Sequence, residues 1–295
     1  MRILPYGKKD FATSTEAGIG DLWDSMFENS FHLKQTQPTP TDRVYRRLVE
    51  RFFQKWTRPT QKDWVLKLDM YNEATWTKYG YFFMERGVDV AYIDISQTII
   101  KLARRRMIRD EVYGKAHPVL GDFRSLPFRP SSFEVSCSFG SIEHVPQWRK
   151  CLEEQRNATK TWGAVIVGVP NIQNVWMRYW SCRLLDKIGL LKKLTSYELH
   201  FAPQEIKKAM KENGLADVEL DGYHLFPKQL RWLDLWIQQF PNRSIAKARN
   251  LLLTPILAVF ERIERQNTKL NLLAEMLIAK GVKLPRACLG HDHDE

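Results

Sequence analysis

The sequence predicts an α/β fold in which a mostly parallel sheet of seven strands carries helices on both faces. Short apolar runs alternate with amphipathic stretches from residue 63 onward, which is the pattern of a doubly wound sheet. Several of these runs end in polar or small residues, at the edge where open α/β sheets bind their ligands. With 295 residues, 44% of them hydrophobic, the chain can bury a core of this size.

The first 62 residues are expected to form an arm and a basic helix ahead of the sheet. We predict a short helix near residues 20–29 and a longer one from Thr41 or Asp42 to about Trp56, with an apolar face opposite an arginine-rich one. The expected strands follow at 63–69, 88–94, 118–121, 133–138, 162–169, 218–225 and 274–282. The expected helices between them lie at 72–86, 96–107, 147–161 and 203–213.

Residues 63–283 are expected to form the main domain, with helical insertions at about 174–196 and 227–273 and a tail at 284–295. Five Lys or Arg and one acid lie between Asn174 and Lys193, beside an apolar stripe. Such a helix packs on the domain, closes over a substrate or lies on an anionic membrane. The net charge of +11 favours anionic partners, but no known nucleic-acid module is present, so nucleic acid is not an expected partner.

The cysteines and the apolar runs favour a cytoplasmic location. The four cysteines are widely spaced and form no CxxC pair, so neither a zinc site nor a disulfide framework is indicated. The N-terminus lacks the apolar core of a signal peptide, and the longest apolar piece, Leu251–Phe260, is too short to span a bilayer. We expect a cytoplasmic protein and leave peripheral membrane contact open.

A first candidate site lies in the segment VDVAYIDIS, where an acid ends the second strand. Asp94 could accept both ribose hydroxyls of an adenosine, and Ile95 could pack on the adenine. The alternative is that Asp94 only caps the following helix.

The longest motif runs from Leu120 to Pro146, LGDFRSLPFRPSSFEVSCSFGSIEHVP. It resembles the signature GDxxxLPFxxxSFDxVxxxxxxxHVP of class I S-adenosylmethionine-dependent methyltransferases, a Rossmann-like family, and is similar to the quinone-biosynthesis group within it. The resemblance implies S-adenosylmethionine as the methyl donor. It also implies donor-binding roles for a set of residues at the strand ends, namely Asp122, Phe123, Ser138, Phe139 and Gly140.

Glu143 and His144 are the candidate catalytic residues, because the resemblance places them facing the acceptor. A histidine near its ordinary pKa can take a proton from a hydroxyl or amine as the methyl group is transferred. The alternative is that the pair only caps the next helix. Some relatives hold a metal with an acidic cluster here, but Gly140 stands at the position of its first acid, so no metal is predicted.

The loop after the first strand departs from the family pattern VLDxGxGxG. This chain reads WVLKLDMYNEATW, with Lys67 at the usual acid and Asp69 at the first glycine. One interpretation is that Asp69, Asn72 or Glu73 binds the ammonium group of the donor. The others are that the site holds a different ligand, or that it is empty. Lys67 is expected to pair with an acid, because a buried unpaired lysine is costly.

Three functions follow from these features. The first is a methyltransferase that acts on a small-molecule or lipid-like acceptor. The second is an enzyme of the same fold that cyclises or cleaves the donor without methyl transfer. The third is a non-catalytic binding protein, which the missing glycines favour.

Overall fold

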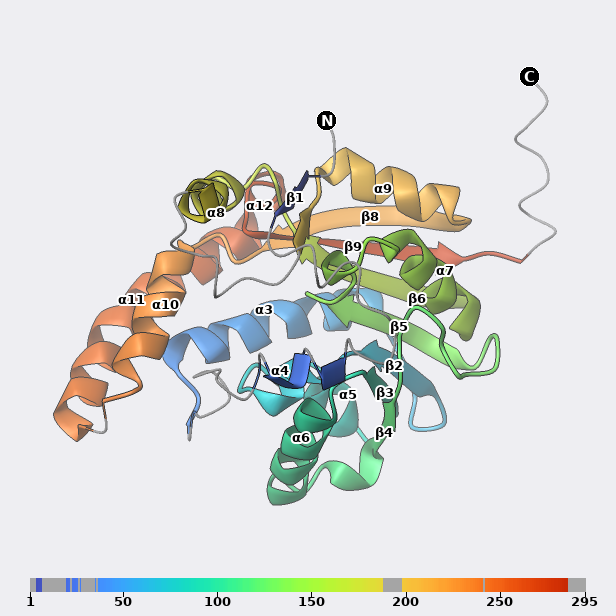
Figure 1. The fold of residues 1–295 in the computed structure, drawn as a ribbon, viewed down its shortest axis with the longest axis horizontal. Helices are drawn as coiled ribbons and strands as arrows, with labels where there is room; N and C mark the ends of the chain where they lie inside the picture. Colours follow the sequence, from blue (N-terminus) through green and yellow to red (C-terminus); the bar gives the residue numbers. More distant parts are fainter. Residues whose placement is uncertain are drawn as a thin grey trace.

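The computed structural model describes residues 4–6, 20–21, 23–25, 27, 35, 37–187, 198–240 and 242–285. In this part of the chain a seven-stranded sheet lies between two layers of helices (Figure 1). The strand order is β4-β3-β2-β5-β6-β9-β8, and only β9 runs antiparallel to its neighbours. The predicted fold class is confirmed.

Every predicted strand is present, with ends shifted by a few residues. The apolar runs form strands because both faces of the sheet are covered, so nearly every side chain of β2 and β3 is buried. The strands are β2 (Trp64–Leu68), β3 (Asp89–Asp94), β4 (Ala116–Leu120), β5 (Phe133–Phe139), β6 (Thr159–Pro170), β8 (Leu215–Tyr223) and β9 (Met276–Lys283).

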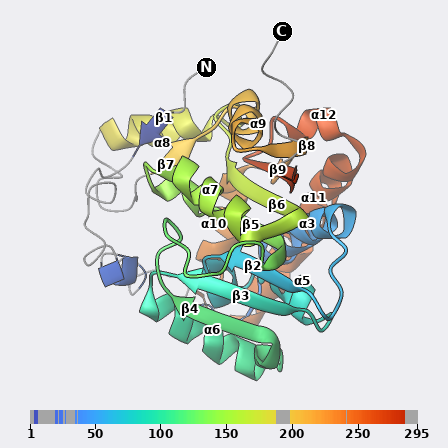
Figure 2. The ribbon, with the colours of Figure 1, turned by 90° about the vertical axis from the view of Figure 1, so that its right-hand side faces the viewer.

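The helices divide between the two faces of the sheet, as Figure 2 shows. One face packs against α3 (Pro40–Trp56), α5 (Tyr81–Met84), α6 (Gln97–Arg109) and α11 (Arg243–Gln266). The other face packs against α7 (Trp148–Ala158) and α9 (Pro203–Glu212). The remaining helices are α4 (Tyr71–Ala74), α8 (Arg178–Lys187), α10 (Lys228–Ile237) and α12 (Thr268–Asn271), with short 3-10 turns η1 (Tyr113–Lys115) and η2 (Ile142–His144).

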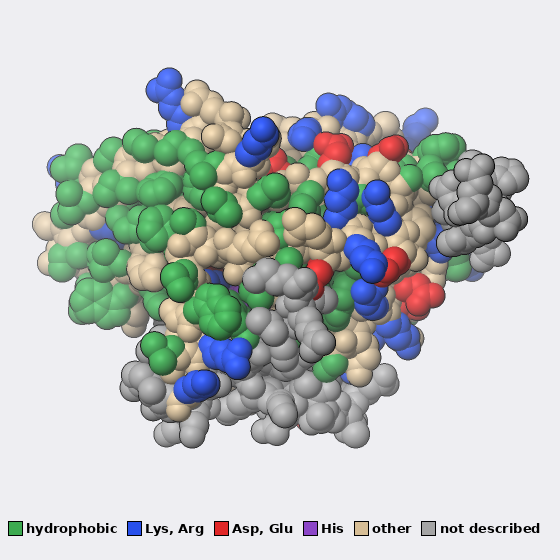
Figure 3. All heavy atoms as spheres, turned by 90° about the horizontal axis from the view of Figure 1, so that it is seen from above, with side chains coloured by type: hydrophobic (Ala, Val, Ile, Leu, Met, Phe, Trp, Pro, Cys, Tyr) green, Lys and Arg blue, Asp and Glu red, His purple; other side chains and the backbone are tan. Residues whose placement is uncertain are grey.

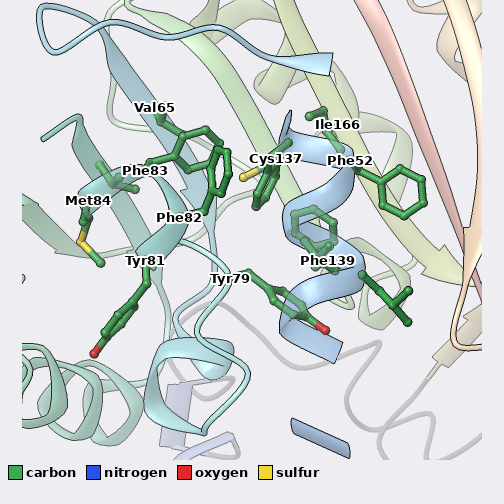
Figure 4. Close-up of a cluster of buried hydrophobic side chains, with 14 of the residues drawn as sticks. Phe52, Val65, Tyr79, Tyr81, Phe82, Phe83, Met84, Cys137, Phe139 and Ile166 are labelled. Atoms are coloured by element: carbon green, nitrogen blue, oxygen red, sulfur yellow. The ribbon is translucent and has the colours of Figure 1, made fainter. Parts of the chain in front are cut away.

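One side of helix α3 is buried in the hydrophobic core that covers one face of the sheet. The helix begins at a capping box, in which Thr39 and Asp42 bond each other's backbone amides. The cap is therefore Thr39, two residues before the predicted Thr41, because Pro40 fits the first position of a helix. The ring of Phe53 on α3 lies 4.6 Å from that of Phe83 and 5.5 Å from that of Phe139 at the end of β5. Figure 4 shows Phe83 and Phe139 in this buried cluster, together with Phe52 of α3. The basic helix expected before residue 62 is therefore continuous with the sheet domain rather than part of an arm.

The prediction of one helix over residues 72–86 is wrong, because this region contains two short helices, α4 and α5. The Thr75 hydroxyl donates to the carbonyl of Asn72 and competes with the helical hydrogen bonds. Lys78 then adopts a left-handed conformation with φ of 50°. The buried carboxylate of Glu73 accepts the amide of Gly80 at 2.8 Å and fixes the start of α5.

Three further differences concern the ends of elements. Helix α7 stops at Ala158, and the residues predicted to continue it to 161 begin β6 instead. A two-stranded sheet of β1 (Leu4–Tyr6) and β7 (Glu198–His200) was not predicted. The helical insertions are present as α8 and as α10 to α12, whereas residues 188–197 and the tail from 286 lie outside the described residues.

Candidate functional site

The loop after β2 contains no glycine, yet it includes a backbone conformation that favours glycine. Asp69, at the position of the first family glycine, has φ of 67°, a conformation that favours glycine. Its amide donates to the carbonyl of Ile93 at 2.8 Å, which holds the loop against β3. Its carboxylate accepts the amide of Tyr71 at 3.0 Å and the hydroxyl of Ser141. These local bonds allow an aspartate to occupy the position.

Lys67 is fully buried and paired with acids, as predicted. Its Nζ lies 3.2 Å from a carboxylate oxygen of Asp69 and 3.1 Å from one of Glu73, and it donates to the carbonyl of Asp69 at 3.0 Å. Burial alone would lower the pKa of Lys67, but the two carboxylates outweigh it and raise that pKa. Asp69 and Glu73, expected as ligands of a donor ammonium, thus bind an ammonium that belongs to the chain itself.

Asp94 lies at the end of β3 as predicted, with 7% of its surface exposed. One carboxylate oxygen accepts the amide of Met70 at 2.7 Å and the other accepts the amide of Ser96 at 2.8 Å. Burial, with the nearby Asp69 carboxylate, raises the pKa of Asp94 to about 7. Asp94 therefore connects the loop after β2 with the start of α6. Ile95 lies between Asp94 and Ser96, the residue that caps α6.

Asp122 and Phe123 lie after β4. The carboxylate of Asp122 pairs with the guanidinium of Arg124, with N–O distances of 2.7 and 2.5 Å. Phe123 is partly buried and packs against the core on the α7 side of the sheet.

The end of β5 opens into a cavity of about 370 Å³, and four predicted site residues line it together: Phe139, Gly140, Glu143 and His144. Ser138 precedes them and is fully buried in the strand. Gly140 has φ of 73°, and a Cβ there would lie 3.6 Å from the carboxyl group of Glu143. The sharp turn at Gly140 leads into η2, which carries Glu143 and His144.

Glu143 is a buried acid with no ion-pair partner among the described residues. Only 2% of its surface is exposed. Burial raises the pKa of Glu143 well above its ordinary value, and the neighbouring Glu198 adds to the shift. Burial thus favours the protonated form of the carboxyl, and in that form it can donate a hydrogen bond.

The other side of the cavity comes from segments that the sequence did not connect with the site. Arg178 pairs with Glu198 at 2.8 Å and with Glu275 at 3.1 Å, and Lys228 lies 3.4 Å from Glu275. Aromatic and polar side chains complete the lining: Tyr45, Tyr71, Asn72, Thr75, Thr77, Tyr79, Pro170, Tyr223, His224, Arg231, Trp232 and Met276. The sequence signal that could have indicated these residues is their position next to a strand end. His224 directly follows β8, and Glu275 directly precedes the antiparallel strand β9.

Several buried polar atoms of this lining have no hydrogen-bond partner within the described part of the chain. Those outside the ion pairs include Oδ1 of Asn72, Oε2 of Glu143 and Nε2 of His224. Burial lowers the pKa of His224 well below its ordinary value, so its ring is neutral. Buried polar atoms left unpaired by the protein are the atoms with which a bound ligand can pair.

Residues near the N-terminus lie beside this cavity. The ring of Trp23 meets that of His144 edge-on at 5.3 Å, and the ring of Phe27 lies 5.4 Å from that of Tyr71. Asp24 accepts the hydroxyl of Ser96 and, at 3.1 Å, the amide of Thr98. The segment thus covers the ends of β3 and β5.

The sequence was compared with models of known protein families. Residues 78–167 match a model described as a methyltransferase domain. The chain has a class I methyltransferase fold. The match begins after the loop that lost its glycines and ends in β6. No curated protein matches the chain by sequence.

Solved methyltransferases share the architecture at low sequence identity. A chain of the Haloferax volcanii complex between a methyltransferase activator and a methyltransferase is 18% identical, with a TM-score of 0.52, covering 92% of this chain and 97% of that one. An S-adenosylmethionine-dependent methyltransferase from Thermotoga maritima is 12% identical, with a TM-score of 0.54, covering 91% and 100%. A Haemonchus contortus phosphoethanolamine N-methyltransferase is 14% identical, with a TM-score of 0.53, covering 87% and 61%.

Proposed function

We propose that the protein is an S-adenosylmethionine-dependent methyltransferase whose small or lipid-like acceptor binds in the cavity at the end of β5. The observation that carries the proposal is the presence of Gly140, Glu143 and His144 on one cavity wall of a methyltransferase-type sheet. Cytoplasmic location with contact between the basic helices and an anionic membrane is part of the same proposal.

The residues present can hold the donor in a way that differs from the family pattern. Glu73 is turned toward Lys67, so the acceptor for a ligand ammonium on the cavity wall is Oδ1 of Asn72. Asp94 has one hydrogen bond on each carboxylate oxygen, which leaves lone pairs for ribose hydroxyls. Support for the donor itself comes from the Haemonchus contortus relative, which was solved with S-adenosylhomocysteine.

The cavity residues have separate tasks in this proposal. When bound, the donor supplies an electrophilic methyl group on a sulfonium. Glu143, whose buried carboxyl has a raised pKa, donates a hydrogen bond that orients the acceptor. His144 on the same cavity wall takes the proton that the acceptor hydroxyl or amine releases.

Calorimetric titration with S-adenosylmethionine and S-adenosylhomocysteine tests the donor site. We expect both compounds to bind the unaltered protein and neither to bind the Asp94→Ala variant. Asn72→Ala should weaken binding roughly tenfold or more, because a hydrogen bond to a charged group contributes about 1.5–3 kcal/mol. Asn72→Asp keeps the oxygen and should keep the affinity, and Asn213→Ala at the end of α9 is the matched control. Unchanged affinity in Asp94→Ala would refute the ribose assignment.

A non-catalytic binding protein is the second candidate, and the Lys67 cluster favours it. An internal ammonium already occupies the two acids of the rewritten loop. If neither S-adenosylmethionine nor S-adenosylhomocysteine binds or raises the melting temperature, this second function replaces the first.

A further inference from the structure

Helix α11 buries charged residues and exposes apolar ones. Three of its five buried residues are charged, namely Arg249, Glu261 and Glu264, and the other two are the core leucines Leu253 and Leu257. Its exposed side carries leucines: Leu251 and Leu252 are 76% and 65% exposed. A soluble helix normally turns its apolar stripe to the core, so the outward apolar side of α11 indicates that something else covers it.

The exposed apolar side chains continue from α11 onto α10. We call them the apolar face: Trp232, Leu233 and Trp236 on α10, Phe240 in the turn after it, and Ile245, Leu251, Leu252, Ile256 and Val259 on α11. Figure 3 shows hydrophobic side chains gathered over the end of the molecule where Figure 1 places these helices. Patches of this extent on a single chain mark a contact with another molecule or with a membrane.

The charges around the apolar face are of one sign. Every acid of α10 and α11 is buried, because Asp234, Glu261 and Glu264 are at most 8% exposed. The exposed charged residues of these helices are all basic: Arg243, Lys247, Arg262 and Arg265. Arg265 pairs with Glu261. The surface therefore combines tryptophans and leucines with positive charge and offers no exposed acid.

We propose that the apolar face binds the surface of an anionic lipid membrane. Tryptophan, leucine and flanking Lys or Arg are the side chains that lie at a membrane interface, and anionic headgroups attract the basic ones. A second copy of the chain fits less well, because the same face on both copies would bring their positive charges together. No helix in the described ranges is long and apolar enough to cross a membrane, so the contact is peripheral.

The apolar face borders the cavity. Trp232 belongs to the face and also lines the cavity, together with Lys228 one turn earlier on α10. A small hollow between α8 and α10 is lined by both residues and by the exposed Trp176. Membrane binding would therefore bring the cavity close to the lipid surface. The identity of the acceptor rests on the proposed function: the acceptor is then an amphiphile that reaches the cavity from the membrane.

Vesicle sedimentation tests the membrane contact without donor or acceptor, so its outcome does not depend on whether the protein transfers a methyl group. The full chain is mixed with vesicles of phosphatidylcholine alone, or of phosphatidylcholine and phosphatidylglycerol in equal amounts. We expect strong sedimentation only with the anionic vesicles, weakened by added salt. Arg243→Gln with Lys247→Gln should reduce the binding constant about fivefold for each charge removed.

The apolar contribution is tested by Leu251→Gln with Leu252→Gln, which should reduce binding roughly tenfold or more, because both leucines lose apolar burial in the interface. Ile108→Gln with Trp162→Gln is the matched control, since these residues are 53% and 64% exposed on α6 and β6. Equal loss in both pairs, or no binding to anionic vesicles, would overturn the proposal. A dimer in sedimentation velocity that the leucine variant dissociates would overturn it in favour of a second copy.

Discussion

Replacing Lys67 by methionine is expected to destabilise the protein by about 3–5 kcal/mol, the cost of removing one partner from a buried ion pair. The ammonium lies 3.1 Å from Glu73, and both side chains are completely buried. Without Lys67, the carboxylate of Glu73 keeps one hydrogen bond, from the amide of Gly80, and no countercharge. Asp69 is less affected because it still accepts bonds from Tyr71 and Ser141.

The measurement is urea unfolding at pH 7, with the free energy of unfolding taken from midpoint and slope. Lys67→Met combined with Glu73→Gln should recover most of the loss, since the second change removes the unpaired charge. The loss in Lys67→Met should also shrink as the pH falls, because burial raises the pKa of Glu73 and protonation removes its charge. A single variant within about 1 kcal/mol of the unaltered protein, or a double variant no more stable than the single one, would refute the reasoning.

Three further outcomes are expected. The free energy of unfolding should fall as the pH rises from about 4 to about 7 and level off above, because burial raises the pKa of both Asp94 and Glu264 to about 7, and the folded state keeps protons that the unfolded state releases. Gly222→Ala should destabilise by about 1–3 kcal/mol in thermal unfolding, because a Cβ there would lie 1.9 Å from the carbonyl oxygen of Asn271. Gly140→Ala should cost about 1–2 kcal/mol, because φ is 73° there.

Each of these outcomes has its control. Glu264→Gln should flatten the pH dependence, and an unchanged slope would show that another group causes it. Gly114→Ala meets no atom within 4 Å and should change stability by less than about 0.5 kcal/mol. Equal effects at Gly222 and Gly114 would contradict the packing argument. Gly140→Ala without loss of stability would show that β5 ends in a turn that tolerates a side chain.

The sheet could be predicted from the sequence because its strands are buried on both faces and therefore read as continuous apolar runs. The same reasoning failed for residues 72–86, where the apolar spacing suited one helix. There the decisive bonds are made by side chains: the hydroxyl of Thr75 on the backbone of Asn72, and the carboxylate of Glu73 on the amide of Gly80. Periodicity does not report such local competition.

The near wall of the cavity could also be predicted, because Phe139, Gly140, Glu143 and His144 are neighbours in the sequence. The far wall could not, because it is assembled from α3, α8, α10 and the strands at the other edge of the sheet. Only the fold brings Arg178 to within 3.1 Å of Glu275. The pairing of Lys67 with acids was predicted on physical grounds, since a buried ammonium requires a countercharge.

The charges of the loop after β2 are balanced within the chain. Asp69 has a left-handed backbone conformation, and Asp94 anchors the loop through the amide of Met70. The carboxylates of Asp69 and Glu73 are neutralised by Lys67. A ligand ammonium would compete with a lysine that is already desolvated and bonded. In the proposed function, recognition of a cationic ligand therefore falls to the unpaired oxygen of Asn72, and the Asn72 variants test this assignment.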